Sequence, residues 1–402
     1  MLSSTSAETV RATLPAVGAA IGEITPLFYD KMFAAHPELL RDLFNRGNQA
    51  NGSQRQALAS SIATFATYLV EHPDERPDAM LERIAHKHAS LGVRPDQYPI
   101  VHEHLFAAIV EVLGEAVTEE VAAAWDEVYW LMANALIAAE KRLYAEAGTP
   151  DGDVWREYRV VGRFQETEDV VTFVVQPVDG TPVPASRPGQ YVSVQVRLAD
   201  GARQIRQYSL SGEPDGGLQF SVKRVTGDAS GSPAGEVSNH LHAQVHTGDV
   251  LRVSAPFGDV VPEESDRPLL LVSAGIGCTP MIGILSRLAA DGSGRRVASV
   301  HADRTPAAHA FRTELRQLTE KLPNATADAW YEQPEADAEQ GDDTVTRHEG
   351  RIDLSRIDVP EGAVAYLCGP VPFMKEARGQ LLAAGVAAAD IHYEVFGPDL
   401  GL

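Results

Sequence analysis

The chain has 402 residues, 44% of them hydrophobic, which is enough to form two or three domain cores. Its 34 Lys and Arg against 56 Asp and Glu give a formal net charge of −22, which argues against nucleic acid or an anionic membrane surface as a partner. Two cysteines are too few for a disulfide framework and fit a reducing, cytoplasmic setting.

Residues 1–146 have the apolar periodicity of helices throughout. The start lacks the basic region and apolar core of a signal peptide. Apolar stretches over residues 10–21 and 24–35 predict two helices, the second of which ends at His36-Pro37. A further helix is expected after the capping residues 51–53, and the last one over about residues 120–144. The sequence therefore predicts an all-α first domain.

Residues 147–153 have the composition of a linker, and beyond them the apolar period changes to two. Alternating stretches with intervening turn signals predict a small antiparallel β-barrel over residues 154–264. Over residues 265–402, strands expected to alternate with helices predict a parallel α/β sheet; they are 269–273, 297–301, 325–331, 364–368 and 391–395. The longest apolar run, 269–285, is interrupted by Ser, Gly, Thr and Pro, so we expect no membrane span.

The barrel contains four consecutive residues that suit a flavin dinucleotide, Arg206-Gln207-Tyr208-Ser209. A guanidinium can bind a pyrophosphate with two hydrogen bonds, an aromatic ring can stack on the isoalloxazine, and a hydroxyl can bond a flavin nitrogen. In isolation, such a run is more often a surface arginine beside a buried tyrosine. Segments 187–191 and 235–242 flank it, and the three in order resemble the flavin domain of the ferredoxin reductase family. The resemblance implies an FAD site that includes Tyr191, Arg206, Gln207, Tyr208, Ser209 and Ser238.

A glycine-rich turn follows the first strand of the third domain, Gly275-Ile276-Gly277-Cys278-Thr279-Pro280. Glycines let the backbone approach a pyrophosphate, and the N-terminus of the next helix favours its charge. This turn, and the later Cys368-Gly369-Pro370, resemble the nicotinamide site of the same reductase family and imply NADH or NADPH, without deciding between them. We expect both cysteines to be small wall residues, with a place for Cys368 in the nicotinamide pocket as the alternative.

The end of the chain resembles the tail that covers the flavin in this family, Glu394-Val395-Phe396-Gly397-Pro398. The resemblance implies that Phe396 stacks on the flavin ring and that Glu394 tunes the path of electrons. Without it, the segment would be a short edge strand with an exposed acid.

Two histidines, His86 and His88, lie in a helix expected around residues 81–91. The apolar spacing places His88, and not His86, on the apolar face of this helix. A single histidine on an apolar face is more often a core residue than a ligand. The surrounding pattern, however, resembles the globin part of flavohaemoglobins, and the resemblance implies that His88 is the proximal ligand of the iron of haem b.

The same resemblance assigns the other haem residues. Glu140 and Tyr98 would bond the second ring nitrogen of His88, and a strongly hydrogen-bonded ligand favours activation of oxygen over its storage. On the distal side, Tyr29 would donate a hydrogen bond to dioxygen, with Gln54 nearby. The remaining residues assigned to the pocket are Phe44, Leu58 and Lys87. Without the resemblance, all of these are ordinary core or helix-surface residues.

Over the whole chain, the sequence resembles bacterial flavohaemoglobins, which implies nitric oxide dioxygenation: NAD(P)H reduces FAD, FAD reduces the haem, and dioxygen at ferrous haem converts nitric oxide to nitrate. The expected partners are the small molecules O2, NO and NAD(P)H, and we expect a cytoplasmic monomer. Two alternatives stay open. In one, the globin stores or senses oxygen and the reductase keeps its iron ferrous; in the other, the protein is an NAD(P)H-dependent reductase of flavins, ferric chelates or quinones.

Overall fold

The computed structural model describes residues 2–149, 152–214, 216–227, 233–334 and 344–397. This part of the chain contains no helix that is both long enough and apolar enough to cross a membrane. It forms two compact units. The first comprises the chain up to Trp155 together with Gln195–Arg206, and the second comprises Arg156–Val194 and Gln207–Gly397.

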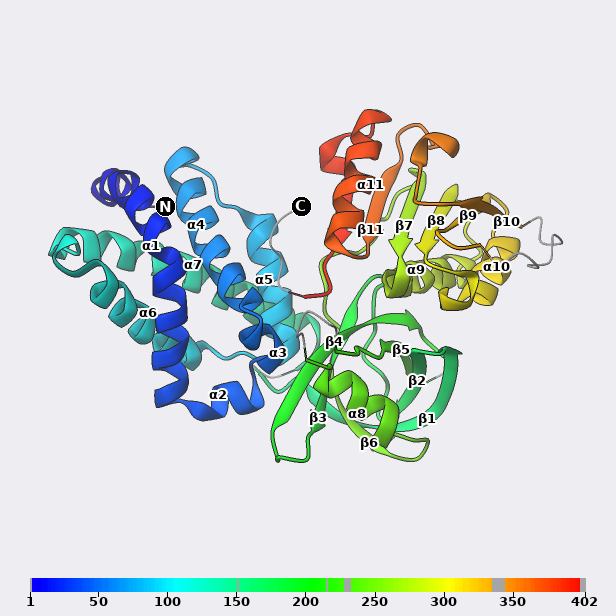
Figure 1. Cartoon of the computed structure of the whole chain (residues 1–402), viewed down its shortest axis with the longest axis horizontal. Coiled ribbons are helices and arrows are strands. Elements are labelled where there is room, and N and C mark those ends of the chain that lie inside the picture. The colour runs from blue at the N-terminus through cyan, green and yellow to red at the C-terminus, as the bar shows by residue number, and fades with distance from the viewer. Residues whose placement is uncertain (1, 150–151, 215, 228–232, 335–343, 398–402) are drawn as a thin grey trace. The chain divides into compact units, whose positions relative to one another are not determined.

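The first unit is built mainly of α-helices (Figure 1), which are α1 (Ser4–Ala35), α2 (Pro37–Asp42), α3 (Arg46–Ala50), α4 (Ser53–Glu71), α5 (Asp78–Leu91), α6 (Tyr98–Leu113) and α7 (Glu119–Glu146). The prediction of two helices before His36 is wrong, because α1 runs unbroken through Pro15 and Pro26. Each interior proline costs about 3 kcal/mol. The buried residues of α1, which recur along the helix from Val10 to Met32, offset this cost by about 1.5–3 kcal/mol for each large apolar side chain.

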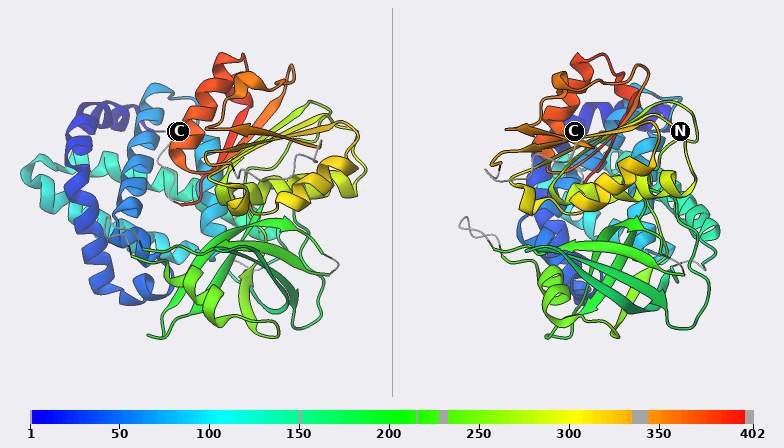
Figure 2. Two further views of the ribbon diagram at one scale, coloured as in Figure 1. Left: turned by 45° about the vertical axis from the view of Figure 1, so that its right-hand side comes forward. Right: turned by 90° about the vertical axis from the view of Figure 1, so that its right-hand side faces the viewer.

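A closed six-stranded barrel follows in the order β1-β2-β5-β4-β3-β6. Its strands are β1 (Trp155–Thr167), β2 (Val170–Pro177), β3 (Tyr191–Arg197), β4 (Arg203–Gly212), β5 (Leu218–Lys223) and β6 (Val250–Ser254), and the short helix α8 (Glu236–Gln244) lies between β5 and β6 in the chain. Pairings of β1 with β2, β2 with β5 and β4 with β5 are antiparallel. The strong curvature of these strands is visible in Figure 2.

The last part of the chain forms a parallel sheet in the order β10-β9-β8-β7-β11-β12. Its strands are β7 (Leu269–Ala274), β8 (Val297–Asp303), β9 (Ala325–Tyr331), β10 (Val345–Glu349), β11 (Val364–Cys368) and β12 (Ile391–Glu394). The helices α9 (Cys278–Ala290) and α10 (Arg312–Lys321) pack on one face, and α11 (Val371–Ala383) packs on the other (Figure 1).

The predicted order of an all-α domain, an antiparallel barrel and a parallel α/β sheet is confirmed. The sequence prediction missed β10, an edge strand in which only Val345 is buried, so that no apolar pattern marks it. The domain boundaries expected at residues 146, 153 and 264 stay predictions. Within the expected linker, Pro150 and Asp151 lie outside the described residues.

Candidate haem, flavin and nucleotide sites

Three helices bring His88, Tyr98 and Glu140 together. Nδ1 of His88 on α5 lies 2.8 Å from Oε1 of Glu140 on α7. It also lies 3.1 Å from the hydroxyl of Tyr98, the first residue of α6. The Tyr98 hydroxyl donates to the same Glu140 oxygen at 2.5 Å. Burial, reinforced by the Glu140 charge, raises the pKa of Tyr98 well above its usual value, so the phenol remains a donor. One carboxylate oxygen thus accepts from two donors and orients the imidazole.

The two histidines of α5 differ in burial and in partners. The side chain of His88 is 32% exposed, whereas His86 is only 5% exposed, so the prediction that His86 lies off the buried face is wrong. The buried positions of α5 include Leu81, Ala85 and Ala89, a stripe rotated by one residue from the expected one. Among the described residues, His88 makes polar contacts through Nδ1, while its Nε2 makes no hydrogen bond. An oriented imidazole with a free second nitrogen has the donor set that a haem iron requires.

Tyr29 of α1, which was predicted for the distal side, is buried beside two glutamine side chains. Burial raises the pKa of its hydroxyl to about 12, and the nearby side chains of Gln54 on α4 and Gln49 on α3 act in the opposite direction. The ring of Phe44 meets Tyr29 edge-on, with centroids 5.9 Å apart. Sequence reasoning missed Gln49, since nothing in its local pattern distinguishes a glutamine in a five-residue helix.

Two other residues predicted for the haem pocket lie on neighbouring helices. Leu58 of α4 packs against the apolar cluster that contains Phe28 and Tyr29. Lys87 is half-buried on α5, next to His88. The residues predicted for the distal side therefore gather around one apolar cluster, and Lys87 lies on the helix that carries the expected ligand.

The flavin motif lies on β4, next to β3 in the barrel order. Ser209 is buried, and its hydroxyl has no hydrogen-bond partner among the described residues, which fits a buried donor that awaits a ligand acceptor. Tyr208 stacks on Phe220 with centroids 5.6 Å apart, and Gln207 Nε2 donates to Ser193 Oγ at 3.0 Å.

The other predicted flavin residues have protein partners. Arg206 Nη1 donates to the Ile205 carbonyl at 2.7 Å. Tyr191 is buried on β3. The Ser238 hydroxyl accepts the Val225 N–H and donates to the Gly235 carbonyl, both at 3.2 Å, so it fixes its own loop.

The two nucleotide motifs meet at the carboxyl ends of adjacent strands. Ser273 of β7 pairs with Cys368 of β11, which pairs in turn with Glu394 of β12. A Cβ added at Gly277 would lie 2.3 Å from the carbonyl oxygen of Cys368, so this position requires glycine. In open α/β sheets, ligands bind at this edge, and the N-terminus of α9 follows directly.

The remaining residues of the two motifs lie in the segments that directly follow β7 and β11. Thr279 Oγ1 donates to the Ile276 carbonyl at 3.0 Å, and Pro280 is buried in the first turn of α9. Gly275 has a φ of 53°, while Gly369 and Pro370 connect β11 to α11. Both cysteines are buried, and burial raises the pKa of each thiol. The two thiols are therefore neutral, and their place in the walls of a nucleotide site stays a prediction.

After β12, the chain continues with Phe396, whose side chain is exposed although large apolar side chains are usually buried. Glu394, Val395 and Gly397 are half-buried. Pro398, the last residue predicted for the flavin site, lies outside the described residues.

Comparison with known proteins identifies the family. Residues 27–136 match the Globin family model, and residues 271–379 match the Oxidoreductase NAD-binding domain. The flavohemoprotein of Chromobacterium violaceum is 43% identical over the full length of both chains. That of Bordetella pertussis is 44% identical over 99% of each. The chain belongs to the flavohaemoprotein family.

Two solved structures are similar to this flavohaemoprotein. The flavohemoglobin from Malassezia yamatoensis, with bound FAD and heme, aligns with a TM-score of 0.88 at 39% identity and covers 98% of this chain and 100% of its own. The FAD/NAD-binding domain of the nitric oxide dioxygenase from Vibrio cholerae aligns with a TM-score of 0.54 at 38% identity, covering 60% of this chain and 99% of its own. The Globin match contains Tyr29, His88 and Tyr98 but ends before Glu140, which the folded structure adds to the site.

Proposed function

We propose that this flavohaemoprotein is a nitric oxide dioxygenase that uses NAD(P)H, FAD and haem b. The anchoring of His88 by the buried carboxylate of Glu140 is the observation that carries the proposal. When bound, the nicotinamide supplies a hydride, FAD divides it into single electrons, and haem b presents dioxygen to nitric oxide, so that one NAD(P)H converts two nitric oxide and two dioxygen molecules into two nitrates.

His88 acts as an electron-rich ligand. Its Nδ1 donates to Glu140 Oε1, so Nε2 carries the lone pair that binds iron. Glu140 is 2% exposed, and water screens its charge little. The anionic acceptor gives the imidazole partly anionic character and increases its donation to the metal. An oxygen carrier does not need this property, whereas an enzyme that activates oxygen does.

Tyr29 acts on the substrate side. Because its pKa is about 12, the hydroxyl stays protonated at physiological pH and would donate a hydrogen bond to dioxygen held in this pocket. The edge-on ring of Phe44 and the apolar side chain of Leu58 exclude water from this donor. The nearby Gln54 side chain lowers the pKa of this hydroxyl, but burial outweighs it.

In the reductase part, Arg206 binds the FAD pyrophosphate, Ser209 bonds a flavin nitrogen, and the exposed ring of Phe396 covers the isoalloxazine. The edge formed by Gly277 and Cys368 takes the nicotinamide nucleotide, and Glu394 tunes the path from flavin to haem. The similar proteins that bind FAD and heme, or that are described as nitric oxide dioxygenases, support these roles. We also propose that the protein is a cytoplasmic monomer. Its domain boundaries in the sequence are proposed to lie at residues 146, 153 and 264.

The test uses Tyr29→Phe beside the parent protein. Loss of a hydrogen bond to a charged or partly charged acceptor, about 1.5–3 kcal/mol, should speed oxygen dissociation roughly tenfold to a hundredfold. Nitrate formation at limiting oxygen should fall with it, while dye reduction by NADH stays at the parent rate. A carrier would show faster release and no nitrate. Absence of nitric-oxide-dependent nitrate in the parent would refute the function, and unchanged nitrate in Tyr29→Phe would refute the distal role.

A further inference from the structure

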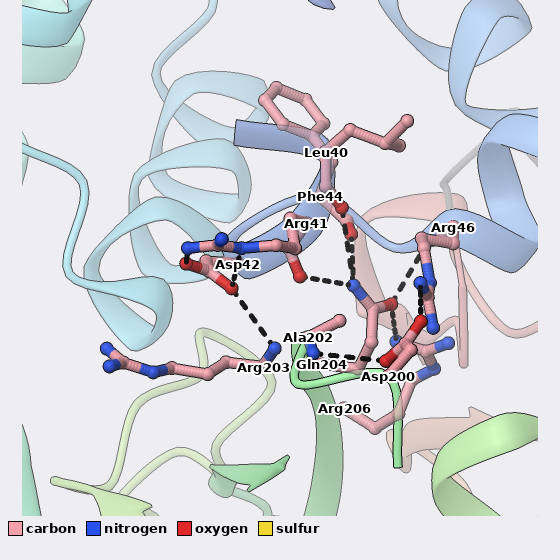
Figure 3. A network of polar contacts seen from close by, with 10 residues as sticks. All are labelled: Leu40, Arg41, Asp42, Phe44, Arg46, Asp200, Ala202, Arg203, Gln204 and Arg206. Carbon is pink, nitrogen blue, oxygen red and sulfur yellow. Dashed lines mark hydrogen bonds and ion pairs between the residues drawn. The ribbon is translucent and has the colours of Figure 1, made fainter. Parts of the chain in front are cut away.

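Gln204, at the start of β4, is 0% exposed and contacts the helical part of the first compact unit. Its Nε2 lies 3.3 Å from the carbonyl oxygen of Leu40, 3.1 Å from that of Arg41 and 3.2 Å from that of Phe44 (Figure 3). Its Oε1 accepts the backbone N–H of Arg46 at 3.2 Å. A single amide therefore contacts four backbone groups that lie about 160 residues away in the chain.

These four groups lie at one corner, formed by the end of α2, the link over residues 43–45 and the start of α3. The last carbonyls of a helix and its first N–H groups have no partner within that helix. The Leu39 carbonyl of α2 accepts the N–H groups of residues 43 and 44, which leaves the carbonyls of Leu40 and Arg41 to Gln204. At the start of α3, Asn45 bonds the N–H groups of residues 47 and 48, and Gln204 bonds that of Arg46.

The corner presents three carbonyl acceptors and one N–H donor, and an amide side chain can bond to both kinds of group. The Nε2 group has two hydrogens, which the three carbonyls share, and Oε1 serves as the acceptor. An ionised carboxylate in the same place has no hydrogen to donate. One of its oxygens would face the three carbonyl oxygens, and the contact would be repulsive. An apolar side chain of equal size would leave donors and acceptors buried without partners.

Two neighbouring contacts join the same segments closer to solvent. The Arg203 N–H donates to Asp42 at 3.1 Å, and Arg46 pairs with Asp200 at 2.6 Å. Both contacts are exposed or partly exposed, and exposed ion pairs contribute little. The buried amide of Gln204 is therefore the main fixed point between the α2–α3 corner and β4.

Gln204 contacts one residue that is assigned to the haem site, Phe44, and one that is assigned to the flavin site, Arg206. Its amide contacts the carbonyl of Phe44, whose ring packs edge-on against Tyr29. On the other side, Nη1 of Arg206, two residues further along the same strand, lies 3.5 Å from its Oε1. We propose that Gln204 is a positioning residue for electron transfer from flavin to haem: it holds the haem-side corner in register with the strand that carries the flavin motif. This inference rests on the proposed function.

The experiment follows both electron-transfer steps separately in the full-length holoprotein by anaerobic stopped-flow. We compare the parent with Gln204→Glu, Gln204→Met and the exposed control Asp200→Asn. Hydride transfer from NADH is followed at the flavin absorbance, and electron arrival is followed at the haem Soret band. Haem and FAD contents are measured on each sample.

We expect flavin reduction at the parent rate in every variant, since the nucleotide motifs are untouched. Haem reduction should slow severalfold in Gln204→Glu and Gln204→Met, because the rate of electron transfer falls as the separation of flavin and haem increases. Asp200→Asn should match the parent. Haem reduction at the parent rate in both Gln204 variants would overturn the proposal. Loss of haem or FAD from both variants would also overturn it, by assigning Gln204 to cofactor retention. A parent that reduces its haem with NADH but forms no nitrate would instead refute the proposed dioxygenase function and leave this inference intact.

Discussion

Replacement of Glu140 by glutamine tests how strongly the buried carboxylate acts on the haem iron. A charge-assisted hydrogen bond contributes about 1.5–3 kcal/mol and a neutral one about 0.5–1.5, so Glu140→Gln should weaken the bond from His88 Nδ1, now 2.8 Å long, by roughly 1–2 kcal/mol. Because electron donation from His88 favours ferric over ferrous iron, this loss should raise the reduction potential. At about 59 mV for each tenfold change, or 1.4 kcal/mol, the rise is about 40–85 mV.

The assay is an anaerobic spectroelectrochemical titration of the haem in the full-length protein. Glu146→Gln is the matched control, because it makes the same change on the same helix at a side chain that is 56% exposed and that pairs, among the described residues, with Arg142. Its potential should equal that of the parent. An unchanged or lower potential in Glu140→Gln at full haem occupancy would refute the argument that Glu140 controls the electron density of the ligand.

Three further substitutions test the other assignments. His88→Ala should purify without haem while dye reduction by NADH survives, and His86→Ala should keep its haem; the reverse pattern in absorption spectra would make His86 the ligand. Arg206→Ala should lower FAD affinity roughly tenfold to a hundredfold, as measured by flavin fluorescence during dilution, because it removes a charge-assisted phosphate contact of about 1.5–3 kcal/mol; unchanged affinity would rule out that contact. Gly277→Ala should raise the KM for NADH, because its Cβ would lie 2.3 Å from a carbonyl oxygen, whereas Gly379→Ala in α11 meets nothing within 4 Å and should keep the parent KM; equal KM values in both would contradict a nucleotide site at this edge.

The sequence by itself determined the elements whose signals are local. Strands β9 and β11 have the predicted limits. The glycine-rich turn is likewise recognisable, because strand β7, the two glycines Gly275 and Gly277, and helix α9 follow one another directly in the chain. Where the cause of a conformation lies within a few residues, the sequence contains it.

Only the tertiary structure decided which faces are buried and which distant groups meet. His86 is buried because the buried face of α5 is rotated from the one that its apolar spacing suggests. Helix α1 continues through Pro15 and Pro26 because buried residues recur along its length. The amide of Gln204 completes the ends of α2 and α3 from a strand that follows them by more than 150 residues. Helix ends leave backbone groups that must be satisfied, but their partners are chosen in space, so no local pattern in the sequence identifies them.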